Sequence, residues 1–138
     1  MNSSQNRRRF PRLNVGPEYV VNFRYQARSF RRTSLVDFGP GGCCVQVPHA
    51  DGQVLERDNM VEQIVLHGPD LPMRQLEGRV AWVMGKRSAD PDGRVVVGIE
   101  FMGVPEETLG LLLEFVSKRL QADLLEPDEL TESGADGR

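Results

Sequence analysis

Six short segments in which apolar and polar residues alternate lie between residues 18 and 102, and clusters of glycine and proline separate several of them. Alternation with a period of two is typical of a β-strand that buries one face. No segment with helical periodicity lies between these runs, so the pattern predicts an antiparallel barrel or sandwich. The expected strands are residues 18–25, 31–38, 43–47, 60–67, 74–84 and 94–102.

The parity of each segment predicts which side chains face the core. In residues 74–84, Leu76, Val80 and Trp82 share one parity, so we expect all three on one face of the strand. Residues 49–59 are polar and show no alternation, which predicts a loop.

The period changes after Pro105. Between residues 106 and 125, apolar side chains recur at spacings of three and four, which is the pattern of an amphipathic helix. Pro105 suits the first helical position, and Pro127 is expected to end the helix. The apolar positions are 109, 112, 113, 116, 120 and 124.

These patterns divide the chain into three parts. Residues 1–12 form an arginine-rich arm that we expect to be flexible, because it holds little apolar surface to bury. Residues 13–126 form a mainly-β domain that includes the C-terminal helix. Residues 127–138 are polar, acidic and free of aromatic residues, which predicts a disordered tail.

Charge is distributed unevenly along the chain. Residues 1–32 carry eight arginines against one glutamate, and residues 100–138 carry ten acidic residues against three basic ones, within a net charge of −3. The basic segment contains arginine and no lysine. Arginine presents a planar fork of donors that matches phosphate, carboxylate and guanine edges. A solvated basic tail is the plainer alternative.

Neither a membrane span nor a disulfide is expected. No apolar run approaches the roughly 20 residues that cross a bilayer, and no secretory signal precedes the first strand, so we expect a cytoplasmic protein without membrane insertion. Cys43 and Cys44 are adjacent, which places their side chains on opposite faces of a strand. We expect both to be small apolar fillers in a reducing compartment.

The sequence contains none of the common catalytic motifs. There is no nucleophile elbow, no phosphate loop and no zinc-protease helix motif. His49 and His67 have no evident partner and are expected at the surface. We therefore expect neither enzymatic activity nor a cofactor.

Two segments carry chemistry that the fold alone does not require. The first is the run Arg7-Arg8-Arg9-Phe10-Pro11-Arg12, in which proline stiffens the backbone that presents the arginines. The second is Asp37 followed by a turn, Phe38-Gly39-Pro40-Gly41-Gly42, whose glycines allow close approach of a ligand. A carboxylate can accept from guanine N1–H and N2–H, and arginine can donate to guanine or phosphate. A structural turn that Asp37 merely caps is the alternative.

Together the two segments resemble the signature of the PilZ domain family, the bacterial receptor modules for cyclic di-GMP. Arg8 and Arg12 match the ends of an Arg-x-x-x-Arg motif, and Arg7 adds the arginine that commonly precedes it. Asp37 and Gly42 match the ends of an Asp/Asn-x-Ser-x-x-Gly motif. The later runs GRVAWV and VVVGIEFMGVPEE also match, so the resemblance covers roughly residues 7–120.

The resemblance implies a fold, a ligand and a mode of signalling. The implied fold is a six-stranded antiparallel β-barrel with a C-terminal helix packed against it. The implied ligand is cyclic di-GMP, which would order the arm on binding, and an unidentified downstream protein would read that change. The implied ligand-binding residues are Arg7, Arg8, Arg12, Asp37, Gly39, Gly41 and Gly42.

The sequence departs from the family motif at Gly39, where the family has serine. A hydrogen bond to a charged group is worth about 1.5–3 kcal/mol, so losing the hydroxyl weakens binding by roughly one to two decades. One alternative is therefore a degenerate PilZ-like domain that binds protein and no nucleotide. A nucleic-acid binder is a further alternative, but the acidic C-terminal half disfavours it, and we expect no nucleic-acid partner.

Overall fold

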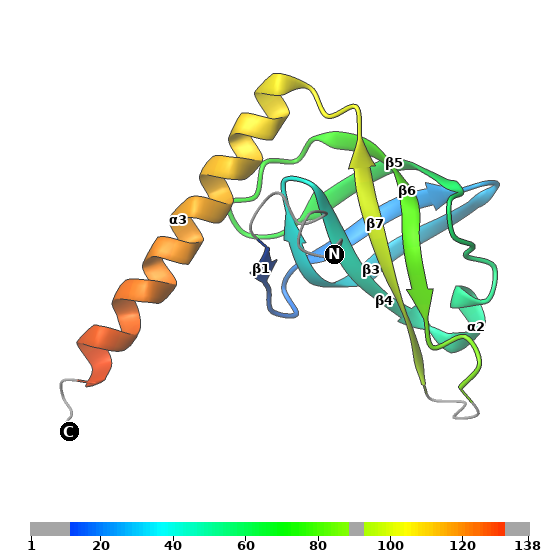
Figure 1. Cartoon of the computed structure of the whole chain (residues 1–138), viewed down its shortest axis with the longest axis horizontal. Coiled ribbons are helices and arrows are strands. Elements are labelled where there is room, and N and C mark those ends of the chain that lie inside the picture. Colours follow the sequence, from blue (N-terminus) through cyan, green and yellow to red (C-terminus); the bar gives the residue numbers. More distant parts are fainter. Residues whose placement is uncertain (1–11, 89–92, 132–138) are drawn as a thin grey trace, which may run out of the picture.

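Six of the seven strands that the structure describes close into an antiparallel barrel (Figure 1). The computed structural model describes residues 12–88 and 93–131, except for the side chains of residues 123–131. The strands follow the order β3-β2-β5-β6-β7-β4, and pairing of β3 with β4 closes the circle, which confirms the predicted fold. The six are β2 (Val20–Tyr25), β3 (Arg28–Gly39), β4 (Gly42–Pro48), β5 (Met60–His67), β6 (Gln75–Met84) and β7 (Arg94–Met102).

Two short elements escape the alternation pattern, namely β1 (Leu13–Asn14) and α2 (His49–Gly52). A two-residue strand is too short to show a period, and α2 is a single turn within the segment that we expected to be a loop. β1 pairs with the far end of β3, where Leu13 lies opposite Phe38 and Asn14 opposite Asp37. This pairing fixes the chain immediately after Arg12.

The inward faces of the barrel strands form one hydrophobic core. Because its members are β-branched, aliphatic or aromatic, each side chain that is fully buried contributes about 1.5–3 kcal/mol relative to exposure. Residues with no measurable exposure come from every side of the barrel, and they include Val21, Phe38, Val45, Ile64, Val80 and Val97.

A β-bulge in β6 reverses the predicted direction of Trp82. Val80 pairs with Ile99 and Trp82 pairs with the next residue of β7, Gly98, so Ala81 is the extra residue of the bulge. Val80 is buried, whereas Trp82 lies on the outer face of the barrel with 38% of its surface exposed. The prediction that Trp82 shares the inward face was therefore wrong, because parity alone does not detect an inserted residue.

Helix α3 (Glu106–Thr131) begins where the period changes and ends later than predicted. The sequence led us to expect an end at Leu125, before Pro127, but the helix continues through Pro127 to Thr131. A proline inside a helix removes one backbone hydrogen bond, which bends a helix more readily than it ends one when flanking residues favour helix. The expected disordered tail therefore overlaps the helix, and residues 132–138 lie outside the described residues.

The first half of α3 packs against β1 and β3 (Figure 1). Phe115 stacks on Phe38 with ring centroids 5.8 Å apart, and it meets the edge of Tyr19 at 6.5 Å. One turn later, Arg119 donates from Nη1 to the Tyr19 hydroxyl at 2.7 Å. The guanidinium of Arg119 also lies over the rings of Tyr19 and Phe115. Through Phe115, the helix is therefore anchored to Phe38, which follows Asp37 in the chain.

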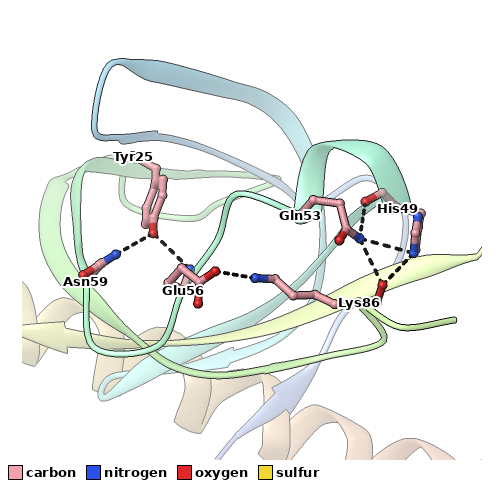
Figure 2. Close-up of polar contacts among 6 residues, drawn as sticks. All are labelled: Tyr25, His49, Gln53, Glu56, Asn59 and Lys86. Carbon is pink, nitrogen blue, oxygen red and sulfur yellow. Dashed lines mark hydrogen bonds and ion pairs between the residues drawn. The ribbon is translucent and has the colours of Figure 1, made fainter.

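A polar network ties α2 and its following loop to the barrel (Figure 2). The buried Tyr25 hydroxyl accepts from the Glu56 backbone N–H at 2.9 Å and from the Asn59 side chain at 2.8 Å. Lys86 forms an ion pair of 2.9 Å with the Glu56 carboxylate, and its carbonyl lies 2.9 Å from His49 Nε2. These partners explain the polar residues of 49–59 as structural.

Both cysteines are buried and unbridged, and Cys43 belongs to the hydrophobic core. In the described part of the chain, no helix has the length and apolar character needed to cross a membrane.

Candidate functional site

The two sequence motifs meet at an ion pair between Arg12 and Asp37. Pairing of β1 with β3 places Asn14 opposite Asp37, which brings Arg12 beside the carboxylate. Arg12 Nη1 lies 2.5 Å from Asp37 Oδ1, and the two side chains are 24% and 19% exposed. Part of each group therefore remains open to solvent, so guanidinium donors and a carboxylate oxygen are available to a ligand.

Of the predicted arm residues, Arg12 is the one that the structure describes. Arg7 and Arg8, together with the rest of residues 1–11, lie outside the described residues. Their contribution to the site stays a prediction.

The predicted glycine turn is the hairpin between β3 and β4. Gly39 pairs with Gly42 across a two-residue loop, Pro40-Gly41, and the Gly41 carbonyl accepts from the Phe101 N–H at 2.9 Å. A Cβ at Gly42 would lie 2.3 Å from the backbone oxygen of Ile99. Gly42 is therefore required by the close approach of β7, whatever else it does.

Gly39 has ordinary backbone geometry. The described glycines with positive φ are Gly85 and Gly103, so Gly39 does not adopt the left-handed conformation that favours glycine. A serine can occupy this backbone conformation without strain.

A row of small residues connects Asp37 to Trp82 across the outer face of the barrel. Asp37 pairs with Cys44, Cys44 with Gly98, and Gly98 with Trp82. Three inter-strand steps span about 14 Å. A Cβ at Gly98 would lie 2.3 Å from the indole, so the Trp82 ring lies over this glycine. The row therefore has a charged pair at one end, small residues between, and an aromatic surface at the other end.

Sequence reasoning missed Trp82 and Gly98 as site residues. The signal that could have found them is Gly98 itself, because a glycine inside a run of valines often marks close approach to its backbone. The β6 bulge that turns Trp82 outward has no such signature in the sequence.

The neighbouring Cys43 thiol is not a reactive group. Burial raises the pKa of the Cys43 thiol far above its usual value, and the nearby Arg12 only partly opposes this effect. Cys43 therefore stays protonated and unreactive. No cluster of three or more metal-ligating side chains occurs among the described residues. The chemistry that this site offers is recognition of an anion with hydrogen-bonding and aromatic parts.

The family of the chain follows from its match to a family model. The model of the PilZ domain matches residues 6–118, which include both motifs, the barrel and the first half of α3. The chain belongs to the PilZ family. No curated protein sequence matched it.

Solved structures share the PilZ fold at low sequence identity. Escherichia coli YcgR in complex with c-di-GMP is 15% identical, with a TM-score of 0.71 over 90% of this chain and 50% of that one. The Klebsiella pneumoniae MrkH complex with c-di-GMP is 17% identical, with a TM-score of 0.62 over 88% of this chain and 54% of that one. The Bacillus subtilis inhibitor of motility MotI is 15% identical, with a TM-score of 0.66 over 83% and 52%.

These PilZ-like structures establish the fold of the chain. The chain spans about half the length of each of the three proteins. What those longer proteins bind or regulate therefore bears on this chain as a basis for proposals.

Proposed function

We propose that this PilZ domain is a cyclic di-GMP receptor that passes the signal to a partner protein. The observation that carries the proposal is the Arg12–Asp37 ion pair, because it joins the arginine motif to the glycine-turn motif across 25 residues of sequence. The family match and the fold shared with two c-di-GMP complexes support it. Under this proposal the protein acts in the cytoplasm, without enzymatic activity, cofactor or nucleic-acid partner.

Each part of the site has a role in this proposal. Asp37 accepts from N1–H and N2–H of a guanine, while Arg12 donates to a phosphate or to guanine O6 and N7. Arg7 and Arg8 add further donors from the arm, which we propose becomes ordered on binding. A second guanine reaches Trp82 across the small residues of the row. Base–aromatic stacking is worth about 1–3 kcal/mol per base.

The glycines shape the approach of the ligand. Gly41 and Gly42 leave backbone without side chains beside Asp37, so a planar base can come close to the hairpin. Gly39 lacks the family's hydroxyl, and we expect affinity lower by roughly one to two decades than with serine.

Gly39 also favours the second candidate function, a degenerate domain that binds protein and no nucleotide. The Arg12–Asp37 pair is also compatible with this alternative, because an ion pair between a guanidinium and a carboxylate can stabilise the fold without binding a ligand. Direct measurement of nucleotide binding separates the two.

Calorimetric titration of the full chain tests the proposal. Cyclic di-GMP, the linear dinucleotide GpG and a short single-stranded DNA are compared at one salt concentration, because contacts to a polyanion are strongly salt-dependent. The proposal predicts saturable binding of cyclic di-GMP, weaker binding of GpG and no saturable binding of DNA. Failure of all three ligands to bind would leave the protein-interaction function.

A further inference from the structure

A depression lies on the outer face of β2, β3, β5 and the start of β6, away from the Arg12–Asp37 pair. Its volume is about 200 Å³, and it opens to solvent. The polar residues that line it are Asn22, Arg24, Ser29, Arg31, Gln63 and Gln75.

Three strand pairings become irregular at this depression. The register shifts between β2 and β3 near Asn22, between β2 and β5 beside the same residue, and between β5 and β6 at Gln63. Gln63 has a φ of 51°, in the left-handed region that glycine adopts most easily. The chain keeps a strained glutamine where glycine would relieve the strain, and strained backbone of this kind concentrates at binding sites.

Hydrogen bonds of the Asn22 side chain hold the backbone around the depression. Its Oδ1 accepts from the backbone N–H of Arg32 at 2.7 Å, and its Nδ2 lies 3.3 Å from His67 Nε2. Arg32 itself has a φ of 51°, so Asn22 holds the bulged turn that presents Arg31. Asn22 is a positioning residue whose polar atoms are already occupied.

The two arginines that line the depression are uncompensated. Within the described part of the chain, Arg24 and Arg31 form no ion pair, whereas Arg28 on the same hairpin pairs with Asp51 at 2.5 Å. Glu62 lies opposite Arg24 in the strand register, without an ion pair between them. The depression therefore offers two guanidinium groups to an external oxyanion.

The remaining polar groups favour a peptide as the source of that oxyanion. The side chains of Ser29, Gln63 and Gln75 make no hydrogen bond with any described residue. Each glutamine amide presents both a donor and an acceptor, which matches a peptide group and not a phosphodiester. No exposed aromatic side chain lines the depression to stack a base, since Phe23 and Phe30 are buried.

We propose that this depression is the docking site for an acidic peptide segment of a partner protein. Arg24 and Arg31 would bind its carboxylates, and Gln63 and Gln75 would bind its backbone. The inference rests on the proposed function for its place in signalling, since it supplies the partner contact. Arg31 and Asp37 are six residues apart on β3, roughly 20 Å along the strand, so nucleotide and peptide can be bound together.

The test is a calorimetric titration of the full chain with acetylated, amidated hexaglutamate, and with hexaglutamine as the uncharged control. The double variant Arg24→Gln/Arg31→Gln is compared with Arg87→Gln/Arg94→Gln. This matched control removes two exposed arginines that form no ion pair within the described residues. We expect the first variant to lose at least tenfold in hexaglutamate affinity and the control to stay within twofold of wild type.

Gln63→Gly separates a binding role from a structural one. Glycine relieves the positive φ, so the melting temperature should stay equal or rise while hexaglutamate affinity falls at least threefold. Equal losses in both double variants would overturn the proposal, because the binding would then be nonspecific charge attraction. Tighter binding of a six-nucleotide DNA than of hexaglutamate at this depression would also overturn it.

Cyclic di-GMP affinity, measured on the same variants, distinguishes this proposal from the proposed function. If Arg24→Gln/Arg31→Gln binds cyclic di-GMP within twofold of wild type but loses hexaglutamate, both proposals stand. If wild type binds cyclic di-GMP and not hexaglutamate, the docking site alone is wrong.

Discussion

Arg12 and Asp37 are 25 residues apart in the sequence and 2.5 Å apart in the structure. Neither of the two sequence motifs by itself places its residue beside the other. The contact depends on the two-residue strand β1, which pairs with the end of β3. A ligand that binds both groups must therefore compete with their attraction for each other. Its binding is favoured, however, because both groups are already held in position.

Trp82 should contribute to nucleotide binding from the far end of the row. Trp82→Ala should weaken cyclic di-GMP binding by roughly 10- to 100-fold, in line with the loss of one base–aromatic stack, and Trp82→Phe should keep most of the affinity. Trp82 is the chain's single tryptophan, so its fluorescence reports directly on the ligand. A saturable ligand titration with unchanged fluorescence would show that the base does not reach it.

Gly42 should be intolerant of any side chain. Gly42→Ala places a methyl group against the Ile99 carbonyl, and we expect a loss of about 1–3 kcal/mol in the free energy of unfolding. Gly110→Ala is the matched control, because no atom lies within 4 Å of the position its Cβ would take. In the helix that substitution should stabilise by about 0.5–1 kcal/mol. Denaturant unfolding measures both, and equal effects would contradict the close approach of β7.

Gly39→Ser should tighten cyclic di-GMP binding. The φ of Gly39 is not in the left-handed region, so serine brings a hydroxyl donor without backbone strain. The expected gain is at most about 1.5–3 kcal/mol. Gly39→Ala is the control that adds bulk without a hydroxyl, and calorimetry measures all three proteins. If the serine and alanine variants bind equally well, the hydroxyl has no role here.

Cys43 should make the protein less stable at alkaline pH. Its pKa is raised in the folded state from an ordinary value of 9.0, chiefly by burial. Its contribution is therefore full below pH 9 and is lost as the pH rises above 9, where the unfolded chain releases the thiol proton and the folded chain keeps it. Each pH unit in that window removes about 1.4 kcal/mol.

Cys43→Val removes this titration, so its unfolding free energy should fall less steeply above pH 9 than that of wild type. Urea unfolding at several pH values measures the difference. Parallel curves for the two proteins would show that the thiol titrates alike in both states.

The barrel was predictable from sequence because its strands bury one face and so must alternate. The period also revealed the start of α3 at Glu106. The period did not reveal the end of the helix. Pro127 indicates a helix end, but the observed helix continues past it to Thr131. β1 also escaped, because its two residues form a strand only by pairing with β3.

The candidate site was half predictable for a related reason. Asp37 and the glycine turn lie in one hairpin, so their proximity follows from chain connectivity. Trp82 lies three strands away from Asp37 around the barrel, and its outward direction depends on the bulge at Ala81. Long-range register of this kind is set by the packing of the whole barrel and leaves no local pattern.

The most direct test of the receptor proposal is calorimetric titration of cyclic di-GMP into wild type, Arg12→Ala and Asp37→Asn. Arg94→Ala serves as a control, since Arg94 is exposed at the start of β7. The account predicts saturable binding to wild type and to the control, and at least a 100-fold loss in each of the other two variants. All four proteins should remain folded, because a partly exposed ion pair contributes about 1 kcal/mol or less. Equal affinity of wild type and Arg12→Ala, or no binding to wild type, would contradict it.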